Sequence, residues 1–212
     1  MRLTRAERMV GEQLRPNGIR DERVLRAMAE LPREEFVPPH QRRIAYEDHP
    51  IAIGGGQTIS QPLVVAAMTQ AIAPQPGETV LEIGSGSGYQ AAVLALLAGR
   101  VIGIERDRRL AERGAETLRR LGITNAEIHH GDGNLGWPEA APYDAIVVSA
   151  AAPGVPPALI DQLADPGRMV VPVESAREGQ QDLLLIRRLA GRLSSQPIFP
   201  VRFVPLVPGT ED

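Results

Sequence analysis

Residues 80–89 read VLEIGSGSGY, so an acid, Glu82, precedes three alternating glycines at positions 84, 86 and 88. An apolar, β-branched run that ends in a glycine-rich turn before the helix-forming segment 89–98 predicts a strand, a tight turn and a helix. Glycine allows backbone angles that side chains forbid and lets a ligand lie against the main chain. The first N–H groups of the helix also stay unpaired. We therefore predict a small-molecule site here, with a purely structural turn as the alternative.

The spacing of the glycines narrows the class of ligand. A dinucleotide motif, G-x-G-x-x-G, would place its third glycine at position 89, where this chain has Tyr89. Glu82 would repel a pyrophosphate but suits a cation, and S-adenosylmethionine carries both an ammonium and a sulfonium. The pattern E-x-G-x-G-x-G after a strand is similar to the first motif of the class I methyltransferases.

Two further acids stand where a nucleoside could meet them. Glu105 ends a second apolar strand 21 positions after Gly84, which is where nucleoside-binding α/β sheets hold ribose hydroxyls. Asp132 lies between two glycines after a third strand and could reach an adenine amino group. The alternatives are a strand that ends at the surface at Glu105 and an ordinary turn at Asp132.

The elements that must position these residues follow from hydrophobic periodicity and capping signals. Alternating strands and helices predict an α/β, Rossmann-like fold: a mostly parallel sheet with helices on both faces, an N-terminal helical extension, and antiparallel C-terminal strands joined through Gly191. A long segment, 33–62, lacks periodicity, which favours a functional loop. The predicted helices cover 4–15, 21–32, 62–73, 89–98, 107–121 and 156–163, and the predicted strands cover 80–83, 100–105, 126–130, 143–149, 167–173, 183–189 and 197–206.

Length and composition limit the classes of protein. A chain of 212 residues suits a single domain, with residues 1–61 as extension and active-site loop and residues 62–212 as core and C-terminal hairpin. The net charge of -3 argues against broad nucleic-acid binding, and the absence of cysteine fits a reducing compartment. The longest apolar run, 91–98, is too short for a membrane span, and the N-terminus is charged rather than signal-like. We expect a soluble, cytoplasmic monomer.

Several motifs together carry a family resemblance. Between about residue 5 and residue 206 the chain resembles protein-L-isoaspartate O-methyltransferase, a family that methylates the α-carboxyl of L-isoaspartyl residues in damaged proteins and so initiates their repair. The loop QTISQP is characteristic of that family. The chain departs from the family pattern at Gly55, where bacterial relatives often have a larger acidic residue, and at Val207, where some relatives have Thr. The motifs are YED (46–48), GQTISQP (56–62), EIGSGSGYQ (82–90), GDG (131–133), YDAI (143–146), AAAP (150–153) and FVPL (203–206).

The resemblance implies a role for each matching position, with S-adenosylmethionine as methyl donor and S-adenosylhomocysteine as product. Ser60 matches the residue usually taken as the active-site one. Gln57, Thr58, Ile59 and Ser60 would close over the donor and the substrate; Glu82, Gly84, Ser85, Gly86, Ser87 and Gly88 would surround the methionine part; Glu105 would lie at the ribose and Asp132 with Gly133 at the adenine, and Arg106 would also bind the cofactor.

The chemistry of the reaction agrees with these residue types. A carboxylate with a pKa of ~4 is already a nucleophile at neutral pH and needs no general base, so the lack of a Cys or Ser-His-Asp pattern is expected. Ser60 would donate a hydrogen bond that orients the acceptor, or, alternatively, cap the helix that starts at Pro62. The histidines, His129 and His130 among them, have no metal-ligand spacing.

Three other functions remain open at this stage. One is a methyltransferase of the same fold that acts on a small molecule or RNA, although the acidic charge balance weakens RNA. Another is a nicotinamide-dependent oxidoreductase, which Glu82 and the missing third glycine argue against. The last is a binding protein without catalysis.

Overall fold

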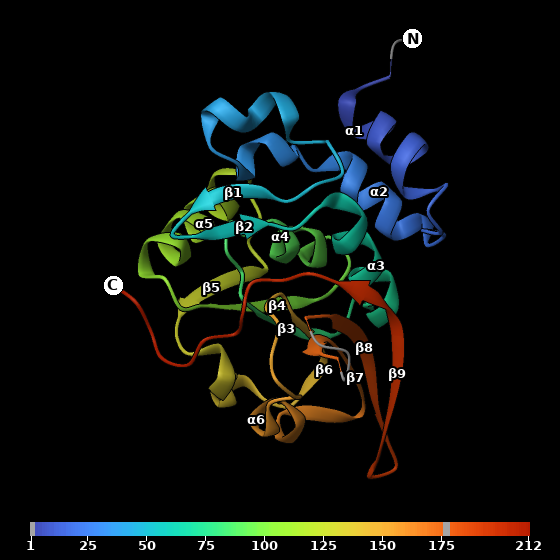
Figure 1. Cartoon of the computed structure of the whole chain (residues 1–212), viewed down its shortest axis with the longest axis vertical. Helices are drawn as coiled ribbons and strands as arrows, with labels where there is room; N and C mark the ends of the chain where they lie inside the picture. The colour runs from blue at the N-terminus through green and yellow to red at the C-terminus, as the bar shows by residue number, and fades with distance from the viewer. Residues whose placement is uncertain (1–2, 176–178) are drawn as a thin grey trace.

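The computed structural model describes residues 3–175 and 179–212 as a seven-stranded sheet with helices on both faces and a separate two-stranded hairpin (Figure 1). The helices are α1 (Arg5–Arg8), continued by the π-helix η1 (Met9–Leu14), α2 (Glu22–Glu30), the 3-10 helices η2 (Arg33–Phe36) and η3 (Pro39–Ile44), α3 (Pro62–Ile72), α4 (Tyr89–Ala95), α5 (Arg108–Arg120), the 3-10 turns η4 (Gly133–Leu135) and η5 (Pro138–Ala140), and α6 (Pro157–Asp161). The strands are β1 (Ile51–Gly54), β2 (Gln57–Ile59), β3 (Thr79–Ile83), β4 (Arg100–Glu105), β5 (Ala126–His130), β6 (Tyr143–Val148), β7 (Leu163–Glu174), β8 (Gln181–Leu189) and β9 (Arg192–Val201).

The main sheet has the strand order β5-β4-β3-β6-β7-β8-β9. Strands β3 to β7 are parallel, whereas β8 and β9 are antiparallel to their neighbours. The chain passes from β3 outward to β4 on one side and later returns to β6 on the other. The carboxyl end of β3 is therefore the switch point at which open α/β sheets bind ligands.

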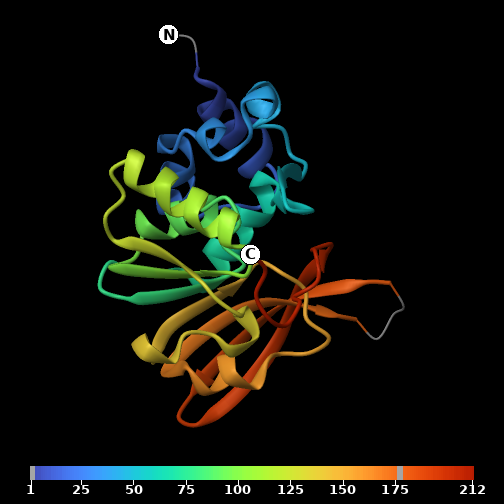
Figure 2. The same cartoon turned by 90° about the vertical axis from the view of Figure 1, so that its left-hand side faces the viewer.

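Side chains alternate between the two faces of β3, and each face has its own core. Val80 belongs to a hydrophobic cluster that also contains Met28 of α2 and Met68 of α3, so the N-terminal extension packs onto the face that α3, α4 and α5 cover. Leu81 belongs to the second cluster, with Leu159 of α6. Figure 2 shows α3, α4 and α5 on one side of the sheet and α6 on the other.

Side-chain caps begin three of the described helices. The Thr4 hydroxyl accepts from the Glu7 N–H while the Glu7 carboxylate accepts from the Thr4 N–H, which completes a capping box. Asp21 caps α2 and Asp107 caps α5.

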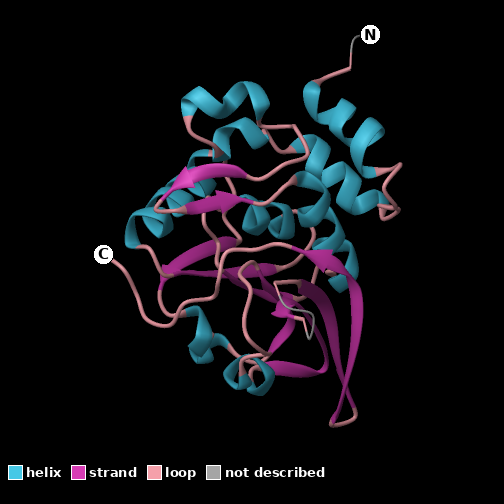
Figure 3. Ribbon diagram, viewed as in Figure 1, coloured by secondary structure: helices cyan, strands magenta, loops and turns pink. Residues whose placement is uncertain are grey.

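The segment 33–62, which lacks periodicity and was predicted as a functional loop, contains regular elements. It contains η2, η3 and the β1–β2 hairpin, which Figure 3 shows as a pair of strands separate from the main sheet. These strands have four and three residues, which is too short for a period-2 pattern to be detected.

The C-terminal strand also differs from the prediction of 197–206. Gly191, with a φ of 73°, forms so tight a turn that β9 already begins at Arg192. The strand ends at Val201, after which the chain leaves the edge of the sheet and crosses to Ala151, which follows β6.

Candidate active site

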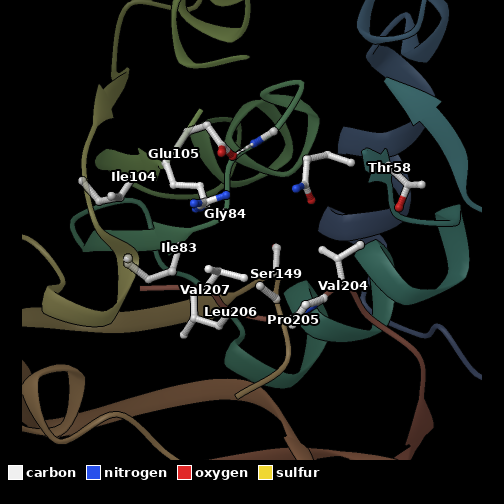
Figure 4. A pocket seen from close by; sticks show the side chains of 15 residues that line it. Thr58, Ile83, Gly84, Ile104, Glu105, Ser149, Val204, Pro205, Leu206 and Val207 are labelled. Atoms are coloured by element: carbon white, nitrogen blue, oxygen red, sulfur yellow. Dashed lines mark hydrogen bonds between the residues drawn. The ribbon is translucent and has the colours of Figure 1, made fainter. Parts of the chain in front are cut away.

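A cavity lies over the carboxyl ends of β3, β4 and β6, and we call it the main cavity. Its empty volume is about 530 Å³, part of it open to solvent. Figure 4 shows Glu105 and Thr58 on opposite sides of it, with Ser149 and the segment Val204–Val207 along its floor. Its lining residues are Gln57, Thr58, Ile83, Gly84, Gly86, Ile104, Glu105, Arg106, Gly133, Ser149, Ala150, Val204, Pro205, Leu206 and Val207.

The glycine turn between β3 and α4 is held to the neighbouring strand β4 by its backbone. The N–H groups of Gly84 and Ser85 both donate to the carbonyl of Ile104, at 2.8 and 3.2 Å. Gly84 has a φ of 80°, and a Cβ there would lie 3.6 Å from the backbone of Ser149, across the mouth of the turn. The turn thus presents main chain to the cavity, as its sequence predicted.

Glu105 fixes this turn as well as lining the main cavity. One carboxylate oxygen accepts the Gly86 N–H at 2.8 Å, and the other accepts the Asp107 N–H at 3.0 Å. The residue is buried, so the alternative of a strand that ends at the surface is wrong. Each oxygen keeps a second lone pair for a ligand, and a contact with ribose hydroxyls stays a prediction.

Glu82 lies in a second, smaller cavity beside the first, the inner cavity. This cavity is lined by Thr58, Ile59, Ser60, Val65, Glu82, Gly84, Ser85, Gly86, Ser87, Tyr89, Gln90 and Ser149. Glu82 is fully buried, and neither carboxylate oxygen makes a hydrogen bond within the described part of the chain. Burial raises the pKa of this carboxyl from 4.5 to about 8; the nearby Ser85 hydroxyl counteracts the rise in part, and the charge of Glu105 adds to it.

Ser60 lies between β2 and α3, at the edge of the inner cavity. It does not cap α3: the N-cap is Gln61, and the Leu63 N–H is accepted instead by the Asp48 carboxylate at 3.0 Å. The interpretation of Ser60 as a helix cap is therefore wrong. Its hydroxyl makes no hydrogen bond to any described residue, so it is available to a ligand.

Gly55, one of the departures from the family pattern, lies at the tip of the β1–β2 hairpin with a φ of 59°. A Cβ at this position would lie 2.6 Å from an oxygen of Asp107, the residue that caps α5. The hairpin is also tied to α5 by the Arg113 guanidinium, which donates to the Ile53 carbonyl. The left-handed backbone at this position accounts for the glycine, and the nearby Asp107 side chain leaves little room for a larger residue.

The GDG turn after β5 contributes only its second half to the main cavity. Gly133 lines the cavity, whereas the Asp132 carboxylate accepts N–H groups of Asn134 and Gly209, at 2.9 and 2.7 Å. These bonds lower the pKa of Asp132 although burial acts against them. In this structure Asp132 joins the turn to the C-terminal segment, and its contact with adenine stays a prediction.

That C-terminal segment, residues 202–211, contains the FVPL motif and Val207, and neither periodicity nor capping in the sequence indicated the course that it takes. The Ala151 N–H donates to the Val204 carbonyl and the Leu206 N–H to the Ala151 carbonyl, which lays Val204–Val207 along the floor of the main cavity. Beyond it, Glu211 pairs with the main chain of Arg106 and with its guanidinium, at 2.7 Å each.

The structure brings most of the predicted site residues together. The exceptions are Asp132 and Gly88; a Cβ on Gly88 would contact Ile128 and Gly114 instead, so it serves the packing of α4 against α5. The predicted residues that line the main or the inner cavity are Gln57, Thr58, Ile59, Ser60, Glu82, Gly84, Ser85, Gly86, Ser87, Glu105, Arg106 and Gly133.

Ser149 was missed, although it lines both cavities and donates its N–H to the Ile83 carbonyl at 2.7 Å. A signal was present, because it ends the predicted strand 143–149, and parallel strands end at the same edge of a sheet. Ile83, Ile104 and Ala150 could have been found on the same ground.

Comparisons with known proteins agree on one family. The family model described as Protein-L-isoaspartate(D-aspartate) O-methyltransferase (PCMT) matches residues 4–211. A protein-L-isoaspartate O-methyltransferase of Gloeobacter violaceus is 52% identical over 198 residues, which are 93% of this chain and 96% of that protein.

Solved structures give the same result. One, a protein-L-isoaspartate O-methyltransferase, superposes with a TM-score of 0.85 at 31% identity and covers 95% of this chain, which spans 65% of that longer chain. Another, a putative protein-L-isoaspartate O-methyltransferase of Plasmodium falciparum in complex with S-adenosyl-L-homocysteine, has a TM-score of 0.82 at 29% identity and covers 95% of this chain and 98% of its own.

Proposed function

This chain belongs to the protein-L-isoaspartate O-methyltransferase family, and from that membership we propose that its two cavities bind S-adenosylmethionine and that Ser60 orients the carboxylate to be methylated. The activity is transfer of a methyl group to the α-carboxylate of L-isoaspartyl residues in damaged proteins.

One observation carries the assignment of roles: two residues, Thr58 and Ser149, line three adjoining spaces. Two of these spaces are the main and inner cavities. The third is an open, mostly apolar groove, the outer groove, which Ser60 also borders. A small ligand in the cavities and a polypeptide in the groove would therefore meet beside Ser60. The groove is lined by Pro50, Thr58, Ser60, Gln61, Leu63, Val64, Ser149, Phe199, Pro200, Val201, Arg202, Phe203 and Val204.

The residues present fit S-adenosylmethionine. Glu82 is a buried carboxyl group whose oxygens have no partner in the described chain, and a cationic ligand would stabilise its ionised form. Ile83, Ile104 and Leu206 offer apolar contacts for a base, and Glu105 offers acceptors for hydroxyls. When bound, S-adenosylmethionine supplies a methyl group on a positively charged sulfur, which needs no further activation.

The remaining work of the protein is to position the acceptor. The isoaspartyl carboxylate is ionised at neutral pH and is its own nucleophile. The Ser60 hydroxyl would donate to one of its oxygens and leave the other aligned with the methyl carbon. Orientation of this kind contributes up to ~7–11 kcal/mol in favourable systems. The apolar side chains of Val64, Val201 and Phe203 in the outer groove would keep water from the reacting oxygen.

A direct test uses two peptides that are identical except at one residue, which is isoaspartyl in one peptide and aspartyl in the other. The protein is incubated with radiolabelled S-adenosylmethionine and either an isoaspartyl peptide or its normal aspartyl twin. We expect base-labile label on the isoaspartyl peptide alone. Equal labelling of both peptides, or label on neither, would reject the assignment, and label on RNA or a small metabolite would indicate another methyltransferase.

Three properties of the whole chain complete the proposal. One hydrophobic cluster contains residues from Met9 to Leu183, which supports a single domain over residues 1–212. None of the described helices has the length and apolar character that a membrane crossing requires. The lack of cysteine supports a reducing, cytoplasmic compartment, and we propose a monomer, which sedimentation would test.

A further inference from the structure

Arg33 is a buried cation that reaches the main chain of the active-site loop. It starts η2 and has 0% of its surface exposed. Its Nη2 donates to the Ser60 carbonyl at 2.7 Å, and its Nε donates to the Ala45 carbonyl at 2.7 Å. The guanidinium also stacks over the ring of Tyr89, 4.5 Å from its centroid.

The charge of Arg33 has no carboxylate partner among residues 3–175 and 179–212, and its Nη1 makes no hydrogen bond there. Burial lowers the pKa of Arg33, but a guanidinium keeps its proton in proteins. A buried charge without an ion partner is costly, and an apolar side chain of the same volume would fill the space more favourably. Packing alone therefore does not account for this residue.

The three contacts of Arg33 connect segments whose relative positions must be fixed for the proposed reaction. Ser60 belongs to the acceptor loop, and Tyr89 is the first residue after the glycine turn. The Ser60 hydroxyl makes no hydrogen bond to the described residues, so nothing on the side chain itself fixes its direction. The bond from Arg33 to the Ser60 carbonyl and the stacking of Arg33 on Tyr89 together connect this residue to α4.

We propose that Arg33 is a positioning residue, which holds the main chain of Ser60 against the start of α4 so that the Ser60 hydroxyl meets the acceptor carboxylate. This inference rests on the proposed function of Ser60. Arg33 itself lines none of the spaces described above, so it acts through Ser60 rather than on the substrate. A displacement of about 1 Å in such a group can reduce a rate by roughly a hundredfold.

The test compares Arg33→Lys and Arg33→Met with Arg42→Met, a control on the neighbouring η3 whose side chain is exposed and pairs with Glu35. Lysine keeps the charge but not the fork of donors, and methionine keeps only the packing. We measure the thermal midpoint, the affinity for S-adenosylhomocysteine, and single-turnover methylation with both substrates saturating. Both Arg33 variants should methylate about ten- to a hundredfold more slowly while product affinity changes less than about twofold; the control should match the wild type.

Combination with Ser60→Ala separates positioning from general support of the fold. If Arg33 acts through Ser60, the double variant Arg33→Met, Ser60→Ala should be only slightly slower than Ser60→Ala alone, because coupled residues are not additive. Fully additive losses, or a wild-type rate in both Arg33 variants, would overturn the inference.

Amide exchange gives a readout that does not need activity. Residues 57–60 should exchange faster in Arg33→Lys than in the wild type, and this holds as a test even if Arg33→Met fails to fold. Unchanged exchange would overturn the positioning role. If the wild type does not methylate an isoaspartyl peptide at all, the proposed function fails, and the exchange comparison still decides whether Arg33 holds the loop.

Discussion

Glu82 should make binding of S-adenosylmethionine depend on pH. Burial raises the pKa of this carboxyl to about 8, so about nine tenths of the unliganded molecules carry its proton at pH 7. A cation that binds in the inner cavity stabilises the ionised form, and binding must then release that proton. The fraction of unliganded molecules in which Glu82 is ionised increases roughly ninefold between pH 6 and pH 7 and roughly fivefold between pH 7 and pH 8. The affinity for S-adenosylmethionine should increase by the same factors.

The stability of the unliganded protein should change in the opposite direction. Between pH 4.5 and pH 8 the folded state holds a proton on Glu82 that the unfolded state has lost, so the free energy of unfolding decreases as the pH rises through this window. Because one pH unit corresponds to about 1.36 kcal/mol, the full effect is at most roughly 5 kcal/mol.

Glu82→Gln removes both effects, because glutamine is neutral throughout. The variant should melt at a higher temperature than the wild type at pH 8, while its affinity for S-adenosylmethionine should be lower and almost independent of pH. Glu112→Gln, on the exposed side of α5, is the matched control and should behave like the wild type.

Titration calorimetry in two buffers of different ionisation enthalpy counts the protons released. We expect about 0.9 protons at pH 7 for the wild type and close to none for Glu82→Gln. Equal proton counts in the two proteins, or a wild-type affinity that does not change with pH, would refute the argument that Glu82 is neutral before the donor binds.

Three further predictions concern the rest of the site. Ser60→Ala should leave the thermal midpoint nearly unchanged, because Ser60 is no cap, and should slow single-turnover methylation by roughly ten- to a hundredfold, as the loss of a charge-assisted hydrogen bond would; a lowered midpoint with a full rate would contradict it. Glu105→Ala should weaken S-adenosylmethionine binding at least about tenfold in calorimetry and also lower the thermal midpoint, because the Gly86 and Asp107 N–H groups lose their acceptors. Deletion of 209–212 should weaken binding of S-adenosylhomocysteine several-fold. Glu211→Gln removes only an exposed ion pair and should reduce the free energy of that binding by less than about 1 kcal/mol. Equal affinities in the deletion variant and the wild type would show that the segment does not support the cavity.

The features that the sequence predicted well depend on neighbours in the chain. The glycine turn lies between the end of β3 and the start of α4, and its conformation is encoded within ten residues. The strand that ends at Glu105 is equally local. Parallel strands then bring their carboxyl ends together without further information.

The features that were missed depend on contacts between distant residues. Arg106 and Glu211 are 105 positions apart, and Arg33 and Ser60 are 27 apart. Neither hydrophobic periodicity nor a helix-capping residue in the sequence identifies such pairs. Arg33 is also a residue type that is seldom buried, so nothing in the sequence indicated its position in the core.

The two acids of the cavities show why a residue type alone is a weak guide to a ligand. Sequence reasoning assigned both acids to the same cofactor, Glu82 for its negative charge beside the glycines and Glu105 for its position at the end of the second strand. In the structure Glu105 is already satisfied by two backbone N–H groups, so its carboxylate would be stable there without any ligand. Glu82 has no partner in the described chain, and such a buried acid is costly unless it is protonated or meets a cation. Of the two, Glu82 is therefore the residue whose ionised form needs a partner that the described chain does not supply, and a cationic ligand would be such a partner.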